Sequence, residues 1–322
     1  MVKHYLDFEK PLIELEREIE HLKRFSRGKQ LHFDEQLKNL EEKLHRLQKE
    51  IFSSLTGWQI TQLARHIDRP KTSYYIQSMF ENFIELHGDR NYGDDPAMIG
   101  GVSKFNGRSV IIIGHQKGSD AKEMAFRNFG MPHPEGYRKA FRLMKLAEML
   151  KKPVLTMIDT PGAFPGVGAE ERGQAGAIAK NLKMMVMLQT PILTMVIGEG
   201  GSGGALAIGM GDRILMLEHS IYSVISPEGC AAILWKDGRK GELAADSLKL
   251  TANDLYRLGV IDEIVKEPLG GAHRDPRRMA ENLKEVVERH LRELEKIESE
   301  ELLNIRYEKF RRVGVFIEEK RV

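Results

Sequence analysis

Five short runs of apolar residues in the middle of the chain constrain its fold more than any other feature. They lie at residues 109–114, 154–158, 192–197, 213–217 and 221–225. An unbroken apolar run of this length is typical of a strand that is buried on both faces of a sheet. Helical stretches at 134–151 and 168–188 would cover such a sheet. The middle of the chain, 98–265, therefore predicts an α/β domain with a parallel or mixed sheet.

Helical periodicity replaces these runs toward both ends of the chain. Between residues 12 and 51, leucine, isoleucine and phenylalanine recur every three or four residues among charged side chains. The letters SRG at 26–28 interrupt this pattern, which predicts two helices folded as a hairpin. The hairpin either packs on its own protein or binds a partner, and the pattern favours neither. From His273 the helical period returns, and it ends in a basic tail, 309–322, of a kind typical of solvated surface.

Composition excludes several classes of protein. Lys and Arg number 49 and Asp and Glu number 47, so the net charge of +2 lacks the basic excess of a nucleic-acid-binding chain. The single cysteine, Cys230, permits no intrachain disulfide and no zinc or iron–sulfur site built from several cysteines. The sequence has no signal-peptide pattern and no run of about 18 apolar residues. We therefore expect a cytoplasmic protein that contacts neither membrane nor nucleic acid.

Two glycine-rich loops follow predicted strands and carry the candidate chemistry. The first, DTPGAFPG at 159–166, follows the run 154–158, and the second, GEGGSGGA at 198–205, follows the run 192–197. Each loop precedes a predicted helix. Backbone N–H groups at a helix start have no acceptor within the helix, so they can donate to a ligand oxygen. Both loops therefore predict binding sites for an anion or an oxyanion.

Two familiar nucleotide-binding motifs overlap these loops. DTPG at 159–162 matches an element of GTPases, but the chain contains no GxxxxGK[ST] loop to hold the phosphates. The glycines at 198, 200 and 203 satisfy GxGxxG, and Glu218 ends the next strand where a ribose-binding acid would stand. The helix between these strands is short and contains two further glycines, which disfavours dinucleotide binding.

A serine hydrolase is the more serious alternative. Residues 200–204 satisfy GxSxG between a strand and a helix, which makes Ser202 a candidate nucleophile. Its partners would have to be a later acid and histidine, and Asp246 and His273 are the only suggestive pair. Neither stands in a recognisable setting.

Four other observations have a structural and a functional interpretation. Cys230 follows a helix start, with Ser226 as the expected N-cap and Pro227 in the first turn, so we expect a packed thiol. Asp159 either acts as a base or accepts N–H groups of its own turn. Lys117 either attracts a substrate carboxylate or is solvated. The eleven histidines form no HExxH, and we expect no metal site.

Longer segments of the sequence resemble one family. NFGMPHPEGYR at 128–138, DTPGAFPGVGAEERG at 159–173, IGEGGSGGALAIGMGD at 197–212, YSVISPEGCAAILWK at 222–236 and EPLGGAHRDP at 267–276 closely resemble the alpha subunits of the bacterial multisubunit acetyl-CoA carboxylase carboxyltransferase. The resemblance implies a crotonase-like (ClpP/crotonase) α/β fold, a spiral of ββα units with an N-terminal helical hairpin and C-terminal helices. We expect a helical region at 1–75, a crotonase-like core at 76–296 and a charged tail at 297–322. The resemblance further implies that the family domain starts near residue 36.

The resemblance also implies an activity and partners. Members of the family join a zinc-ribbon beta subunit as an α2β2 heterotetramer, and the metal would then lie outside this chain. They transfer the carboxyl group of carboxybiotin, held on the biotin carboxyl carrier protein, to acetyl-CoA. The product is malonyl-CoA for fatty-acid biosynthesis. ATP is consumed by biotin carboxylase, another component of the complex.

The expected site residues follow from the same resemblance. Backbone donors for the biotin carbonyl are expected at Gly203, Gly204 and Ala205, and the thioester site is expected in the beta subunit. Further residues are expected to line the substrate pocket: Pro161, Gly162, Ala163, Phe164, Gly166, Gly200, Gly201 and Lys117. Backbone donors explain why the loops contain no acid–base pair, because the charge that develops is on oxygen.

Overall fold

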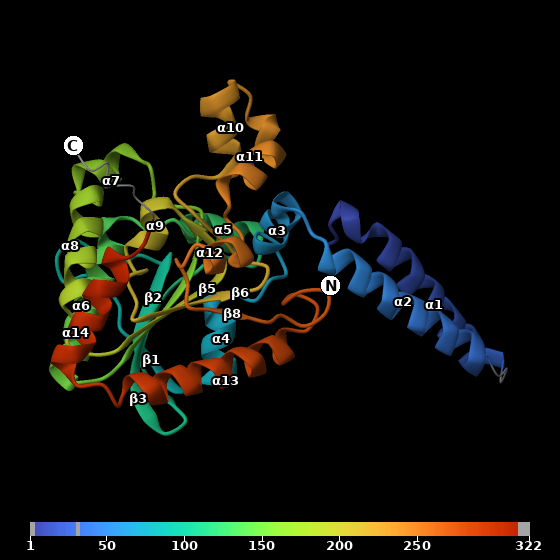
Figure 1. The fold of residues 1–322 in the computed structure, drawn as a ribbon, viewed down its shortest axis with the longest axis horizontal. Helices are drawn as coiled ribbons and strands as arrows, with labels where there is room; N and C mark the ends of the chain where they lie inside the picture. Colours follow the sequence, from blue (N-terminus) through green and yellow to red (C-terminus); the bar gives the residue numbers. More distant parts are fainter. Residues whose placement is uncertain (1–3, 30–32, 315–322) are drawn as a thin grey trace, which may run out of the picture.

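The computed structural model describes residues 4–29 and 33–314, and one eight-stranded mixed sheet forms its centre (Figure 1). The strands are β1 (Glu81–Glu85), β2 (Met98–Phe105), β3 (Arg108–His115), β4 (Val154–Thr160), β5 (Ile192–Gly201), β6 (Arg213–Leu217), β7 (Ile221–Ser223) and β8 (Glu263–Val265). Each of the five predicted apolar runs overlaps one of these strands, namely β3, β4, β5, β6 or β7. The strands β1, β2 and β8 were not predicted.

The order of the strands places the two glycine-rich loops side by side. The sheet runs β1-β2-β3-β4-β5-β6-β8, and β7 pairs with the end of β5. From β3 onward the neighbouring strands are parallel, whereas β1, β2 and β3 are antiparallel. Asn106 and Gly107 both have positive φ and join β2 to β3, as a two-residue hairpin turn requires. Since β4 and β5 are parallel neighbours, the loops that follow them leave the same edge of the sheet.

Helices cover both faces of the sheet. One apolar core joins the sheet to α6 (Pro134–Leu150), α8 (Gln174–Met187) and α12 (Ala252–Arg257). The opposite core joins it to α4 (Thr72–Met79) and α13 (Pro276–Leu294), which lies along the bottom of the view in Figure 1. Strands β4 and β5 are buried along nearly their whole length. The unbroken apolar runs therefore reflect burial from two sides, as predicted.

The last described helix, α14 (Ser299–Arg311), also packs on the core. It falls within the segment 297–322 that we expected to be a charged tail. Arg306 is fully buried there, and its guanidinium donates to Asp212 and to the carbonyls of Met185, Leu188 and Thr190. The rest of the predicted tail, 315–322, lies outside the described residues.

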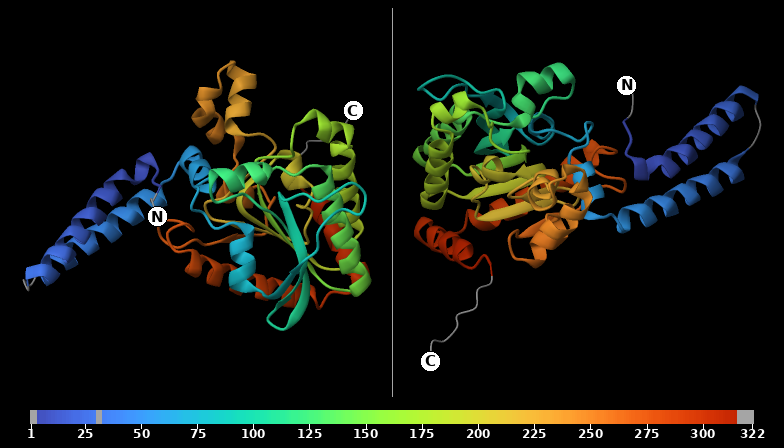
Figure 2. Two further views of the ribbon diagram at one scale, coloured as in Figure 1. Left: turned by 180° about the vertical axis from the view of Figure 1, so that it is seen from behind. Right: turned by 90° about the horizontal axis from the view of Figure 1, so that it is seen from above.

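Two helical pairs project from the core (Figure 2). The N-terminal pair, α1 (Lys10–Lys29) and α2 (Asp34–Ser53), follows a short turn η1 (Asp7–Glu9) and forms the predicted hairpin. The helix α1 continues through the predicted interruption at 26–28, because one glycine near a helix end costs only about 1 kcal/mol. The other pair is α10 (Pro227–Trp235) and α11 (Gly241–Leu248), joined by η3 (Gly238–Lys240).

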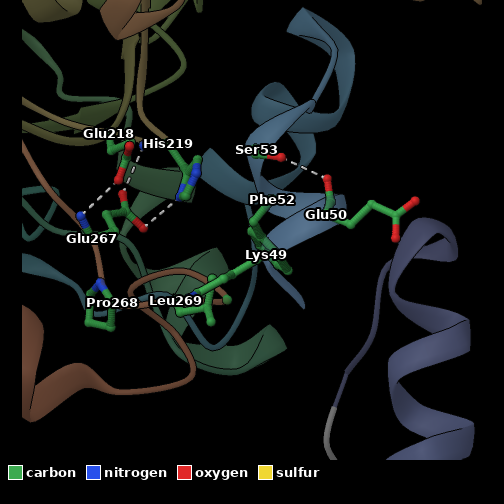
Figure 3. Close-up of a pocket in the computed structure, with 10 residues that line it drawn as sticks. Lys49, Glu50, Phe52, Ser53, Glu218, His219, Glu267, Pro268 and Leu269 are labelled. Carbon is green, nitrogen blue, oxygen red and sulfur yellow. Dashed lines mark hydrogen bonds and ion pairs between the residues drawn. The ribbon is translucent and has the colours of Figure 1, made fainter. Parts of the chain in front are cut away.

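The N-terminal hairpin attaches to the core through its base. The Arg274 guanidinium bonds Glu9 and Glu16 at 3.0 and 2.5 Å. The Phe52 ring, at the end of α2, meets His219 edge to face at 5.9 Å, and the His219 ring faces the Glu267 carboxylate (Figure 3). Among the described residues, no helix is both long and apolar enough to cross a membrane.

The remaining helices connect these layers. They are α3 (Gly57–Ala64), α5 (Ala121–Phe126), η2 (Asn128–Gly130), α7 (Val167–Glu171) and α9 (Ser202–Leu206). The stretch 168–188, predicted as one helix, contains α7 and α8, which Arg172 and Gly173 separate. Gly173 adopts positive φ there, which ends the first helix.

Candidate active site

The two glycine-rich loops touch each other through their backbones. A Cβ atom on Gly201 would stand 2.1 Å from the Pro161 carbonyl oxygen, so no other residue fits there without a shift. A Cβ atom on Gly204 would stand 2.5 Å from the carbonyl carbon of Gly162. Gly200, whose added Cβ would meet the Tyr222 ring at 2.9 Å, is enclosed as well. The missing side chains of the second loop therefore permit close contact between polypeptide segments.

The first loop is held in place by the segment before α6. The Phe164 amide donates to the Pro132 carbonyl at 3.0 Å, and the Phe164 ring stacks on His133 at 4.2 Å. A Cβ atom on Gly166 would stand 2.4 Å from the Phe164 ring. Gly166 thus gives room to the ring, and Ala163 and Pro161 remain partly exposed beside it.

The start of α9 presents backbone donors at this contact. The strand β5 ends at Gly201, and Ser202 turns the chain with a positive φ of 50° into the helix. Amides of the first three helical residues, Ser202, Gly203 and Gly204, have no acceptor within the helix. The Ala205 amide has its α-helical acceptor, the Gly201 carbonyl, four residues earlier. Of the three expected donors, the N–H groups of Gly203 and Gly204 therefore have no partner within the helix, whereas the N–H group of Ala205 has one.

Apolar side chains are exposed around the glycine-rich loops. Leu206 belongs to α9 itself, and Val167 begins α7 directly after the first loop. Val224 follows Ser223, the residue that pairs with Gly201 across β7 and β5. Exposed apolar side chains beside a site are typical of a surface that another polypeptide covers.

Three charged side chains lie behind the loops. The Lys117 ammonium stands 2.9 Å from Asp159 and 3.1 Å from Glu199, which lie at the starts of the two loops. Asp159 also accepts the Glu199 amide at 3.1 Å, so it bonds the neighbouring strand and not its own turn. Although burial opposes ionisation, Lys117 lowers the pKa of Asp159 below its ordinary value. An ionised carboxylate held by a lysine is a poor general base at neutral pH.

The proposed partners of a serine nucleophile lie elsewhere in the fold. The Asp246 carboxylate accepts the Gly57 amide at the start of α3. The His273 ring stacks on His66 at 4.1 Å, beside Glu9 at the base of the N-terminal hairpin. Since both groups have other neighbours, they do not form a triad with Ser202.

The expected N-cap of α10 is confirmed. The Ser226 hydroxyl accepts the Gly229 amide at 3.0 Å, and Pro227 is the first residue of the helix. Cys230 is partly buried in this helix and forms no disulfide.

Glu9, His66 and His273 come close enough together to resemble a metal-binding group. However, Nδ1 of His66 accepts the Asp68 amide and Nε2 faces the His4 carbonyl, so both ring nitrogens are engaged. Arg274 also holds the Glu9 carboxylate. The three residues pack and hydrogen-bond with one another and their neighbours. Their spacing in the sequence did not indicate that they would meet.

Neutral His66 makes the stability of the protein depend on pH. Burial, followed by the proximity of His273, lowers the pKa of His66 to about 4. An unfolded histidine titrates near about 6.5, so between these values the unfolded state binds more protons and stability falls as pH falls. When the pH is lowered from about 7.5 to about 5, we expect His66 to reduce the unfolding free energy by about 2 kcal/mol. Urea titrations at the two pH values should show a smaller drop in unfolding free energy for the His66→Asn variant than for the wild type. An equal drop in both proteins would contradict this assignment.

Comparisons with known proteins agree with the resemblance. A family model described as "Acetyl co-enzyme A carboxylase carboxyltransferase-like" matches residues 5–314. The chain is 57% identical to the acetyl-coenzyme A carboxylase carboxyl transferase subunit alpha of Geobacter metallireducens, over 98% of this chain and 99% of that protein. Identity is also 57% to the corresponding subunit of Methylococcus capsulatus, over 98% of each chain.

The chain belongs to this family.

Solved structures of other carboxyl-handling enzymes share the fold. Transcarboxylase 12S, with methylmalonyl-coenzyme A bound, superposes with a TM-score of 0.54 at 19% identity, covering 69% of this chain and 43% of that chain. A Pseudomonas malonate decarboxylase hetero-tetramer in complex with coenzyme A gives 0.52 at 17% identity, covering 67% and 86%. These neighbours confirm the predicted crotonase-like fold.

Sequence reasoning named Lys117 and Asp159 but missed three other charged residues near the loops, Glu199, Arg65 and Glu228. Glu199 stands within the glycine-rich stretch, and its Oε1 accepts Nε of Arg65 at 2.8 Å. The other end of the Arg65 guanidinium bonds Glu228 at 2.6 Å. A buried carboxylate at a strand end needs a cation as partner, so Glu199 itself could have signalled an ion pair. The sequence did not indicate which cation forms it.

Proposed function

We propose that this chain is the alpha subunit of a carboxyltransferase that moves a carboxyl group from carboxybiotin to acetyl-CoA, giving malonyl-CoA. Membership of the family over nearly the whole chain is the observation that carries the proposal. The arrangement of the loops supports it, since unpaired amides at the start of α9 meet a second backbone segment. The expected carboxyl donor is carboxybiotin on a separate carrier protein, and acetyl-CoA is the expected acceptor.

The chemistry requires donors aimed at oxygen. Carboxybiotin supplies an activated carboxyl group, and its release leaves negative charge on the ureido oxygen of biotin. In this proposal the amides of Gly203 and Gly204 stabilise that charge, and residues 161–164 line the pocket beside them. Fixed donors of this kind typically contribute about 2.7 to 4 kcal/mol each to lowering a barrier. Glycine is suited to position 204, because an added Cβ atom there would stand 2.5 Å from the Gly162 carbonyl carbon and displace the amide.

A partner subunit completes the site in this proposal. The relatives are named subunit alpha, and the exposed apolar residues Leu206, Val167 and Val224 border the loops. We propose a zinc-ribbon beta subunit that binds most of the CoA, an α2β2 assembly, and cytoplasmic biotin carboxyl carrier protein and biotin carboxylase as further components. The metal would belong to the beta subunit.

Reconstitution tests the proposal. The chain is mixed with its beta subunit, a carboxybiotin-loaded carrier and acetyl-CoA, and malonyl-CoA is measured. We expect product with both subunits and none with either alone. Absence of product from the complete mixture would overturn the proposal, and parallel reactions with longer acyl-CoA substrates would define the acyl preference.

Replacing Ser202 with alanine should leave the transferase rate within about threefold of the wild type. The Ser202 side chain is exposed and acts in this proposal only through its backbone. A serine hydrolase would lose nearly all activity, typically about 10⁶-fold in kcat when the nucleophile is removed. A loss of that size in the reconstituted assay would favour the hydrolase.

A further inference from the structure

One ammonium group joins the ends of the two strands that carry the loops. Lys117 follows β3 by two residues, and its Nζ atom lies 2.9 Å from Oδ1 of Asp159 and 3.1 Å from Oε2 of Glu199. Asp159 stands two residues before Pro161 in the first loop. Glu199 stands two residues before Gly201 in the second. The contact of Pro161 with Gly201 thus lies two residues along each chain segment from the ion pairs that Lys117 forms.

The lysine is enclosed by other parts of the chain. Its side chain is 14% exposed, and a Cβ atom on Gly130 would stand 2.6 Å from its Cγ atom. Gly130 ends the turn η2, in which three consecutive residues, 128–130, have positive φ. This turn therefore covers the methylene groups of Lys117, and the glycine permits the close approach.

Lys117 and Arg65, the two cations of this cluster, are both paired with carboxylates. Beyond Glu199 the contacts continue to Arg65 and from there to Glu228, so two positive groups meet three negative ones. Lys71 contributes from farther away, and its own ammonium donates to the His66 carbonyl. Although burial opposes it, the charges of Asp159 and Glu199 raise the pKa of Lys117, which keeps the ammonium protonated.

We propose that Lys117 is a positioning residue that holds both glycine-rich loops in the geometry for carboxyl transfer, and that it does not bind a substrate carboxylate. The inference rests on the proposed function of the α9 amides. Without the ammonium, Asp159 and Glu199 would be adjacent like charges in a buried setting, and their repulsion would favour a larger separation. Their separation would move Pro161 and Gly201, and with them the amides of Gly203 and Gly204.

The closing experiment compares Lys117→Met, Lys117→Arg and Lys309→Met in the complex with the beta subunit. Lys309 is a matched control, because its side chain is 15% exposed and its ammonium bonds Asp262 and the Gly211 and Asp212 carbonyls. These groups precede β8 and β6, at the opposite edge of the same sheet. We expect Lys117→Met to lower kcat for malonyl-CoA formation at least 30-fold with the KM for acetyl-CoA within about threefold. Lys117→Arg should recover most of the rate, and Lys309→Met should retain it.

Hydrogen exchange separates this inference from the proposed function. In Lys117→Met, amides of residues 198–206 should exchange at least tenfold faster than in Lys309→Met, whether or not the complex makes malonyl-CoA. Faster exchange with no product from the wild-type complex would support the positioning role and refute the proposed function. Unchanged exchange in Lys117→Met, or a raised KM at unchanged kcat, would overturn the positioning role.

Discussion

Replacing Gly204 with alanine is expected to lower kcat of the reconstituted complex by about 10² to 10³-fold, the effect of losing one oxyanion donor. The added Cβ atom would stand 2.5 Å from the carbonyl carbon of Gly162 and 2.8 Å from the Ala163 amide nitrogen. Backbone atoms on both sides cannot yield as a flexible side chain would. The helix start and the first loop must therefore separate, and the Gly204 amide moves with them.

The neighbouring Gly203 provides the matched control. A Cβ atom there would meet only the Ile178 Cδ1 atom, at 3.4 Å, which is an ordinary contact. Both variants keep every backbone N–H group and add one methyl group to the same turn. We expect Gly203→Ala to retain kcat within about fivefold. Equal activity of the two variants would contradict the importance of the contact between the loops.

Replacing Arg306 with methionine is expected to cost about 3 to 5 kcal/mol of unfolding free energy. The variant leaves the Asp212 carboxylate buried without its partner, and it leaves the carbonyls of Met185, Leu188 and Thr190 without this donor. An uncompensated buried charge is among the most destabilising changes a single substitution can make. Urea unfolding of the purified chain measures the loss.

Arg311 on the same helix is the control for Arg306. Its side chain is exposed, and its guanidinium bonds the Tyr307 hydroxyl at 3.1 Å. Arg311→Met should change the unfolding free energy by less than about 0.5 kcal/mol. If both variants unfolded at the same urea concentration, α14 would not be anchored to the core as the structure describes.

The central strands could be predicted because burial on two faces leaves a simple pattern. The runs at 154–158 and 192–197 contain few polar residues, since helices cover both sides of β4 and β5. The edge strand β1 lacks this signal, because three of its five residues are exposed, none is buried, and two are glutamate. The hairpin between β2 and β3 did carry a signal, Asn106–Gly107, which the sequence analysis did not use.

The positions of the loops could also be predicted, but their internal contacts could not. Parallel strands deliver their following loops to one edge, so Asp159 and Glu199 had to be near each other once β4 and β5 were adjacent. The cations that hold them come from distant segments: Lys117 lies 82 residues before Glu199, and Arg65 lies 134 before it. No local pattern specifies such pairs.

The glycines of the second loop illustrate how a sequence motif can have two physical origins. The pattern at 198–205 suggested that missing side chains let a ligand approach the backbone. At Gly201 and Gly204 the structure shows another polypeptide segment in that space. Gly203, with nothing closer than a side-chain methyl, is the position where the backbone stays open. The motif therefore combines contact between loops with exposure of donors.

Replacing the Gly204 peptide N–H group with an ester oxygen would test the central claim most directly. Glycolic acid at position 204 removes the donor, adds no side chain and keeps the contact with Gly162. Lactic acid at position 207 is the control, because the Ala207 amide bonds the Gly203 carbonyl within α9. The account predicts that the ester at 204 lowers kcat for malonyl-CoA formation by about 10² to 10³-fold and that the ester at 207 has little effect. Full activity of the ester at 204 would contradict it.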